Sequence, residues 1–345
     1  MPAAPVIEYS KPATDVAGHT ARMLKENDAL LARQRAIAAT LLDRPARSQC
    51  LVCAAVLAGA PSFVHRGIPY VLCRSCRHVQ CAVDAPAGYP QGQQDFADVY
   101  IPLDPAAYRE RSDRIYKPKL DWALRAAKTA ALANLLERSW VELGSGAGHF
   151  VDVLHRAGAK NVLGLEAEEA LVDRSVHVPD ERRVRRYGGS LADAIRQHPA
   201  EIYAAWFVLE HCFELREVMA ALDERPRGTV LLLSVPMLGL ATLLEVIGDA
   251  HFARQLDSVV HLQLFTENSL ARLLDLAGFE QRAAWVFGQD ADDLLRMIAV
   301  GLAAKGNRPI FGPEIDRLLA ACSWIQQAID RAHLADARHV LAVKR

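Results

Sequence analysis

Apolar residues follow two different spacings over the C-terminal two thirds of the chain. Continuous apolar runs, such as residues 139–143, 202–208 and 228–236, predict buried strands, and the segments between them carry apolar residues at helical spacing. Strands that are apolar throughout and alternate with helices are typical of a parallel sheet covered on both faces. The pattern therefore predicts an α/β fold with a doubly wound, mainly parallel sheet.

The same pattern sets the expected order of elements. Strands are predicted at residues 139–143, 161–166, 183–187, 202–208, 228–236, 281–288 and 338–345. Helices are predicted at residues 118–137, 147–157, 168–174, 191–197, 213–223 and 266–278. The last of these helices has Thr266 as its N-cap and Gly278 at its C-terminal end. The sheet is thus expected to have seven strands, and the chain to end inside it.

The first 116 residues differ in character from the rest. A helical lead-in, a small β-prone module, a linker rich in Pro, Gly and Gln, and the main domain are expected at residues 1–48, 49–82, 83–116 and 117–345. The lead-in contains one long helical pattern, at residues 16–43, which ends before Pro45. In the main domain, the connection at residues 237–265 is longer than usual, and we expect it to be a lid over a ligand.

The composition narrows the classes of partner. The 345 residues include 40 basic and 41 acidic side chains, a formal net charge of -1, which disfavours nucleic acid as a partner. No apolar run approaches the roughly 18 residues that a membrane span needs, and the N-terminus does not resemble a signal peptide. We therefore expect a cytoplasmic protein without a membrane partner.

Four of the seven cysteines form two close pairs in the small module. Cys50 and Cys53 make one C-x-x-C motif, and Cys73 and Cys76 make the second. This spacing is typical of a tetrahedral Zn²⁺ ion held by four thiolates, which leaves no open position for catalysis. We expect a structural zinc ribbon, with a redox or iron site as the alternative.

A glycine-rich loop follows the first strand of the main domain. Gly144, Gly146 and Gly148 let the chain turn sharply and let a ligand approach the backbone. The third glycine of the dinucleotide pattern G-x-G-x-x-G would fall at position 149, which is His149, so a pyrophosphate site is less favoured. Glu166 ends the second strand, where a carboxylate can accept both hydroxyls of a ribose. Loop and acid together predict a nucleoside site.

Five segments carry a family resemblance: "VELGSGAGHF", "GLE", "WFVLEHC", "LLLSVP" and "HLQLFTENSLARLLDLAGFE". In order and spacing they resemble class I S-adenosylmethionine-dependent methyltransferases over residues 117–345, and most of all the subgroup that methylates small molecules. The resemblance implies a Rossmann-like methyltransferase sheet. It also implies that Glu166 holds the ribose of S-adenosylmethionine, and that the rest of the cofactor meets Glu142, Gly144, Ser145, Gly146 and Gly148.

The sequence departs from this family at two places. Many relatives carry an acid after the third strand for the adenine amine, whereas here Ser190 and the backbone of Leu191 would have to serve. The fourth strand often carries an Asp, and Ala204 and Ala205 stand at the matching place. These departures support an alternative in which the chain is a catalytically weak methyltransferase-fold binding module.

Methyl transfer from a sulfonium mainly requires that the acceptor is positioned and loses its proton. His211 follows the fourth strand at the ligand edge of the sheet and is the predicted base, with Glu210 beside it as an orienting residue. A helix cap is the structural alternative for His211. His251, His261 and Tyr116 are expected to contact the substrate, with plain packing as the alternative for each.

A zinc ribbon ahead of such a domain resembles the arrangement of proteins that modify sugars and natural products, including C-methyltransferases of nucleotide-linked sugars. We therefore predict S-adenosylmethionine-dependent methyl transfer to a small polar metabolite, with a sugar or a sugar-derived intermediate as the expected acceptor. RNA methylation, for which zinc-bearing enzymes also exist, is a second alternative. The sequence contains no motif that selects an acceptor atom or an oligomeric state.

Overall fold

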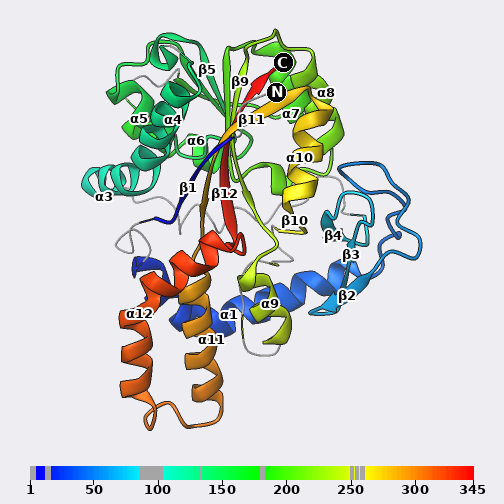
Figure 1. Cartoon of the computed structure of the whole chain (residues 1–345), viewed down its shortest axis with the longest axis vertical. Helices are drawn as coiled ribbons and strands as arrows, with labels where there is room; N and C mark the ends of the chain where they lie inside the picture. Colours follow the sequence, from blue (N-terminus) through cyan, green and yellow to red (C-terminus); the bar gives the residue numbers. More distant parts are fainter. Residues whose placement is uncertain are drawn as a thin grey trace.

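The computed structural model describes residues 5–11, 17–84, 104–132, 134–178, 183–248, 252, 256 and 261–345. Its centre is an eight-stranded sheet with the order β1-β11-β12-β9-β8-β5-β6-β7 (Figure 1). These strands are β1 (Val6–Tyr9), β5 (Trp140–Leu143), β6 (Val162–Glu166), β7 (Val184–Arg186), β8 (Ile202–Trp206), β9 (Val230–Pro236), β11 (Phe279–Phe287) and β12 (Ala337–Lys344). Only β12 runs antiparallel to its neighbours, β9 and β11. The expected doubly wound, mainly parallel sheet is confirmed.

Helices cover both faces of this sheet, because its strands alternate apolar side chains between two cores. On β8, Ala204 and Trp206 point into the core under α4 (Lys117–Thr129) and α5 (His149–Arg156). Tyr203 and Ala205 of the same strand point into the core under the helices of the other face. Those helices are α7 (Leu191–Gln197), α8 (Leu215–Asp223) and α10 (Glu267–Leu276).

An eighth strand, β1, extends the seven that the sequence predicts. Residues 6–9 lie in the segment expected to be a helical lead-in, yet they pair parallel to β11 at the edge of the sheet. The indole of Trp285 donates a hydrogen bond of 2.9 Å to the Ser10 carbonyl just beyond the strand. Four residues are too few for a readable alternation, and their partner strand lies far along the chain. The helix α1 (Ala17–Leu41) follows, close to the predicted bounds.

The structure differs from the prediction in two further places: part of the linker is helical, and the helix predicted at residues 118–137 is divided in two. The part of the linker that the structure describes forms α3 (Pro105–Arg111) and a π-helical turn, η2 (Ser112–Tyr116). The helix α4 ends at Thr129, and a 3₁₀ turn, η3 (Leu135–Glu137), begins after Asn134, whose φ of 52° is left-handed. Shorter helices lie at α6 (Glu169–Val172) and η4 (Ser175–His177).

The cysteine-rich module forms a second sheet with the order β10-β4-β3-β2. Three of its strands, β2 (Ser62–His65), β3 (Ile68–Leu72) and β4 (Val79–Cys81), come from the module itself. The fourth, β10 (Gln263–Leu264), belongs to the predicted lid and pairs antiparallel with β4. Buried residues of the module share one apolar core with α8 and α10. The module is therefore packed onto the main domain through both a sheet and a core.

Earlier in the predicted lid, the structure describes the helix α9 (Leu240–Ile247). The helices α11 (Asp290–Ala304) and α12 (Gly312–Arg331) form an antiparallel pair that extends away from the sheet (Figure 1). None of the helices in the described ranges is both long and apolar enough to cross a membrane. The cytoplasmic location stays a prediction.

A buried ion pair joins the module, α1 and α9. Arg66, in the turn between β2 and β3, has its guanidinium 3.2 Å from the Glu245 carboxylate of α9, and both side chains are almost fully buried. The same guanidinium donates to the side chain of Gln34 on α1. His65 lies 3.5 Å from Glu245. Burial alone would raise the pKa of Glu245, but His65 and the positive charge of Arg66 outweigh it and hold that pKa below its ordinary value.

The variant Glu245→Ala is expected to lower the free energy of unfolding by about 3–5 kcal/mol, because it leaves Arg66 as an uncompensated buried charge. Chemical denaturation measures this loss. Since the folded-state pKa of Glu245 is lowered, the contribution is present at neutral pH and disappears as the pH falls through that pKa. The matched control is Glu314→Ala, which removes an exposed pair with Arg317 and should cost less than about 1 kcal/mol. An equal loss in both variants would contradict the prediction.

Candidate functional site

The glycine loop leaves the sheet between β5 and α5 in a conformation that requires glycine. Gly144, Gly146 and Gly148 have φ angles of 65°, 54° and 76°. A Cβ atom on Gly144 would lie 2.7 Å from a methyl group of Val208, and one on Gly148 would lie 2.6 Å from Val178. A Cβ atom on Gly146 would meet nothing within 4 Å. The outer two glycines therefore allow close packing, while the middle one faces open space where a ligand can approach.

Glu166 lies against this loop. One carboxylate oxygen accepts the backbone N–H of Gly146 at 2.7 Å, and the other accepts those of Ala167 and Glu168 at 2.9 and 3.0 Å. Burial raises the pKa of Glu166, and the three N–H donors act in the opposite direction. The structure thus brings together the loop and the acid that the sequence assigned to one nucleoside site, with the carboxylate held in one orientation.

Three buried ionisable groups lie behind the loop: the carboxyl groups of Glu142 and Glu210 and the ammonium group of Lys119. Glu142 is almost fully buried, and its Oε2 atom has no hydrogen-bond partner within the described ranges. Burial raises its pKa well above the ordinary value, and Lys119 of α4 acts against this increase. Burial also lowers the pKa of Lys119 to about 7, while Glu142 and Glu210 raise it. The Ser145 hydroxyl, at the start of the loop, is likewise buried and without a described partner.

Lys119 is a site residue that sequence reasoning missed. Its ammonium lies 4.5 Å from the ring centre of Tyr116 and 5.2 Å from that of Trp206, so aromatic faces stabilise the charge. The available signal was its position, because Lys119 shares a face of α4 with the buried Ala123 and Ala126. A lysine in the apolar stripe of a helix is unusual unless it is paired or functional.

An aromatic stack supports the loop from the linker side. The ring of His149 lies between Tyr108 and Tyr116, with ring centres 4.0 and 5.2 Å away. Tyr108 donates a hydrogen bond of 3.0 Å to the Ala147 carbonyl inside the loop. His149 is 2.9 Å from the Ser112 hydroxyl, and burial lowers its pKa to about 3, so it is neutral. Tyr116 thus contacts His149, next to the glycine loop, and its substrate role stays a prediction.

The turn after β8, η6 (Leu209–His211), carries the two residues predicted to act on the acceptor. It begins after Phe207, a non-glycine residue with a φ of 57°, which is a strained conformation. Burial raises the pKa of Glu210 to about 8. His211 and His261 have their ring centres 5.1 Å apart, and His261 Nε2 lies 4.0 Å from Glu210 Oε1. The structure therefore brings His261 next to the predicted pair, whereas His251 lies outside the described residues.

Gln263 holds this turn in place. Its buried side-chain amide donates to the carbonyl oxygens of Leu209, Glu210 and Cys212 at 3.2, 3.0 and 2.6 Å. Its amide oxygen lies 2.9 Å from Nε2 of His78, which follows the second cysteine pair by two residues. The turn and the cysteine-rich module are therefore joined through one side chain.

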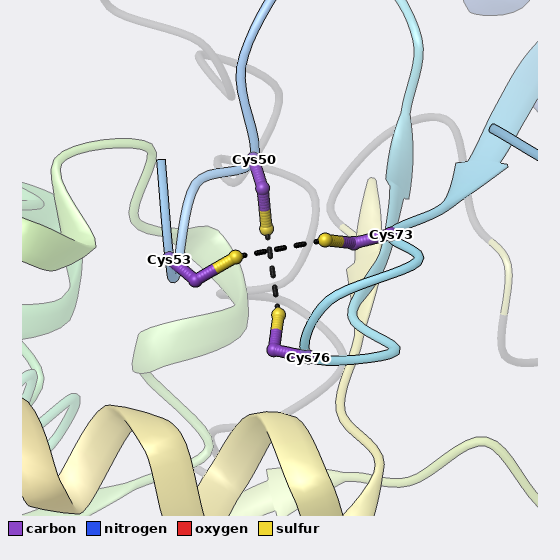
Figure 2. A group of neighbouring side chains, drawn as sticks. All are labelled: Cys50, Cys53, Cys73 and Cys76. Atoms are coloured by element: carbon purple, nitrogen blue, oxygen red, sulfur yellow. Dashed lines mark hydrogen bonds between the residues drawn. The ribbon is translucent and has the colours of Figure 1, made fainter. Parts of the chain in front are cut away.

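The four cysteines of the module converge on one point (Figure 2). Sγ atoms of Cys50 and Cys76 are 3.6 Å apart, as are those of Cys53 and Cys73, and all four lie within 4.8 Å of one another. After each pair the chain reverses through a residue with left-handed φ, Ala54 or Arg77. The Sγ–Sγ distances of 3.6 Å match the separation of about 3.8 Å expected between thiolates that each bind a tetrahedral Zn²⁺ at about 2.3 Å.

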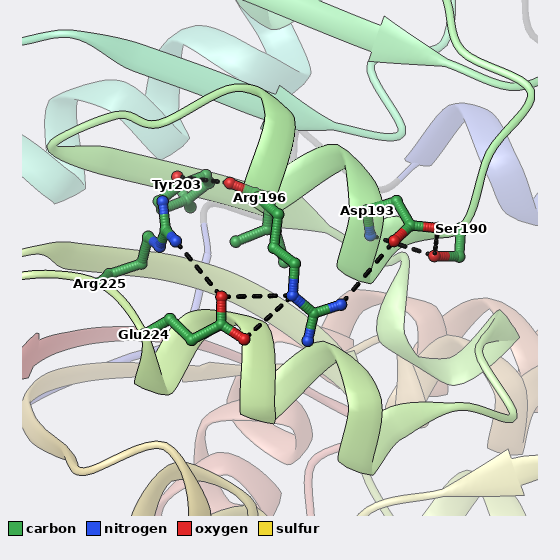
Figure 3. A network of polar contacts seen from close by, with 7 residues as sticks. Ser190, Asp193, Arg196, Tyr203, Glu224 and Arg225 are labelled. Carbon is green, nitrogen blue, oxygen red and sulfur yellow. Dashed lines mark hydrogen bonds and ion pairs between the residues drawn. The ribbon is translucent and has the colours of Figure 1, made fainter.

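The predicted adenine contact, Ser190, has a structural use. It is the N-cap of α7, where its hydroxyl accepts the N–H of Asp193 at 3.1 Å and donates to the Asp193 carboxylate at 2.8 Å (Figure 3). Arg196 then ties α7 to Glu224 beyond α8. The adenine role of Ser190 and of Leu191, the next residue, stays a prediction.

Ala204 and Ala205, at the place where the sequence departs from the expected acid, each lie in one of the two cores of the sheet. Ala204 lies beside Glu142 in the register of β5 and β8, and Ala205 points to the other face. An acid at position 204 would place a second buried carboxyl group next to Glu142. The local packing therefore suits an alanine here.

Comparison with known structures finds similar folds at low identity. The magnesium protoporphyrin IX methyltransferase of Synechocystis PCC 6803 with bound SAH is 16% identical, with a TM-score of 0.42, over 68% of this chain and 86% of that one. A putative sarcosine dimethylglycine methyltransferase from Galdieria sulphuraria is also 16% identical, with a TM-score of 0.41, over 65% of this chain and 86% of that one.

Sequence comparison identifies the family. No curated protein matches the chain. Residues 109–284, more than half of the 345, match the family model of the methyltransferase domain. The chain therefore belongs to the methyltransferase-domain family.

Proposed function

We propose that this protein transfers a methyl group from S-adenosylmethionine to a small polar metabolite, a sugar or sugar-derived intermediate. The observation that carries the proposal is the Glu166 carboxylate, which three backbone N–H groups hold beside the open face of Gly146. The three N–H groups use three of the roughly four lone-pair sites of the carboxylate, so the oxygen that accepts from Gly146 retains one for a ribose hydroxyl group. The match to a methyltransferase family supports the same function.

The residues behind the loop suit the amino-acid end of the cofactor. Glu142 and the Ser145 hydroxyl are buried polar groups with unused hydrogen-bonding capacity in the described structure. A buried polar atom of this kind is costly unless a ligand or water satisfies it. We propose that Glu142 acts on the cofactor's ammonium group, through the loop, and that Lys119 balances the negative charge of the site.

S-adenosylmethionine would supply an already activated methyl group, so the protein's task is to position the acceptor and remove its proton. The nucleophilic atom of the acceptor would take the methyl group, and the electrons of the broken carbon–sulfur bond would return to sulfur. Glu210, His211 and His261 are proposed to act on the acceptor, because they lie at the edge of the sheet where β8 ends.

The acceptor class rests on charge and on the polar groups of the turn. A formal net charge of -1 does not favour the many phosphates of RNA. Imidazole and carboxylate groups at one place suit an acceptor with several oxygen or nitrogen atoms. The alternative function, a catalytically weak binding module, would keep the cofactor site and lack turnover.

We also propose that Cys50, Cys53, Cys73 and Cys76 bind a structural Zn²⁺ ion. The geometry of the four sulfur atoms supports this, and all four sites around the ion would be filled by protein. Such an ion would contribute on the order of 10 kcal/mol to folding of the module.

Calorimetric titration with S-adenosylmethionine and S-adenosylhomocysteine tests the function. Wild type is expected to bind both ligands, and Glu166→Ala should bind at least about 10-fold more weakly, because a hydrogen bond to a charged group contributes about 1.5–3 kcal/mol. Glu169→Ala is the matched control, since that exposed carboxylate pairs with Arg186 on the surface. Glu166→Gln keeps the size of the side chain and removes its charge, so it checks that weaker binding by Glu166→Ala does not arise from misfolding.

A folded wild type that binds neither ligand would refute the proposed function. Binding without transfer to any acceptor in a screen of sugars and sugar nucleotides, followed by mass spectrometry, would favour the binding module.

Metal analysis of the purified chain tests the zinc proposal. One Zn²⁺ per chain is expected, and Cys76→Ser should lose it together with hydrogen-exchange protection over residues 50–81. Cys322→Ser is the control, because this thiol lies on α12 and contacts Asp292. Retention of zinc by Cys76→Ser, or its loss in the control, would contradict the assignment.

A further inference from the structure

Glu210, His211 and His261 place three metal-binding groups around one point, outside the cysteine cluster. One ligand atom from each side chain lies within 4.8 Å of the others. Glu210 and His211 come from the turn η6, and His261 comes from the segment before β10. Residues from two distant parts of the sequence thus converge at the edge of the sheet where the proposed acceptor would bind.

The Glu210 carboxyl group is the second observation that points to a ligand. Its side chain is fully buried, and neither oxygen has a hydrogen-bond partner in the part of the chain that the structure describes. Nearby groups that can carry positive charge include His211, His261, whose Nε2 is 4.0 Å away, and Lys119. A carboxylate removed from water needs a counter-charge or hydrogen bonds, and a bound cation provides the counter-charge.

The two segments that carry these residues are held together. The Gln263 amide, two residues after His261, donates to the carbonyl oxygens of Leu209, Glu210 and Cys212. Because these bonds fix the backbone on both sides of the point, the three side chains are organised before any ion arrives. A metal site needs such preorganisation to bind tightly.

We propose that Glu210, His211 and His261 bind a divalent transition-metal ion. Two imidazoles and one carboxylate suit Mn²⁺, Fe²⁺, Co²⁺ or Zn²⁺ better than Mg²⁺ or Ca²⁺, which prefer oxygen ligands alone. Three protein ligands leave coordination positions open, as in catalytic sites, whereas the four-cysteine cluster is closed.

This inference rests on the proposed function and gives its acceptor site a chemistry. The open positions would take oxygen or nitrogen atoms of the acceptor, and the ion would act as a Lewis acid that makes an acceptor hydroxyl easier to deprotonate. The proton would pass to water. His211 would then serve as a ligand of the ion, in place of the free base that the sequence predicted.

Electron paramagnetic resonance of Mn²⁺ tests the site in the full chain already loaded with zinc. Mn²⁺ is the suitable probe because thiolates favour zinc, so the cysteine cluster keeps its own ion. Wild type should remove about one equivalent of Mn²⁺ from the free signal. Glu210→Gln and His261→Ala should each bind at least about 10-fold more weakly, since loss of even an outer-shell partner costs 10–100-fold in metal affinity.

His155→Ala is the matched control, because this histidine lies in the last turn of α5 and is not one of the three proposed ligands. Thermal melting and titration with S-adenosylmethionine on the same samples show whether each variant folds and keeps its cofactor site. Absence of Mn²⁺ binding in wild type, or binding by Glu210→Gln and His261→Ala that is as tight as in wild type, would overturn the proposal. Mn²⁺ binding without cofactor binding would instead refute the proposed function and leave the ion site intact.

Discussion

The buried amide of Gln263 is the contact on which the arrangement of this protein's site depends. It satisfies three carbonyl groups of the turn after β8 and meets His78 on its other side. Buried carbonyls without partners would each cost free energy, so this side chain stabilises the turn away from water. The strained residue Phe207 lies just before this turn, where only surrounding contacts can hold it in place.

Through this contact the cysteine-rich module becomes part of the methyltransferase domain. Its β4 pairs with β10, its apolar residues extend the core under α8 and α10, and Arg66 reaches the buried Glu245. A structural ion in the module would therefore stabilise more than the module itself. It would make rigid the wall against which the turn η6 is packed.

Burial of charge sets the electrostatics of the site. Glu142, Lys119 and Glu210 lie out of water within one region, where Lys119 lowers the pKa of both carboxyl groups and both carboxyl groups raise the pKa of Lys119. Such groups are costly in an empty protein and are usually kept for a ligand that satisfies them. A cationic cofactor on the Glu142 side and a metal ion on the Glu210 side are consistent with two separate carboxylates that share one lysine.

The sequence alone determined the sheet, the glycine loop, the acid at the end of β6 and the cysteine pairs, because each depends on local spacing. Apolar runs predict strands, glycines allow left-handed φ, and C-x-x-C motifs predict a metal-binding turn. The tertiary structure alone decided that residues 6–9 join the sheet, that Lys119 enters the site, and that His261 lies beside Glu210. Each of these depends on a partner far along the chain, and contacts across such separations are set by how the whole core packs rather than by any pattern of neighbours.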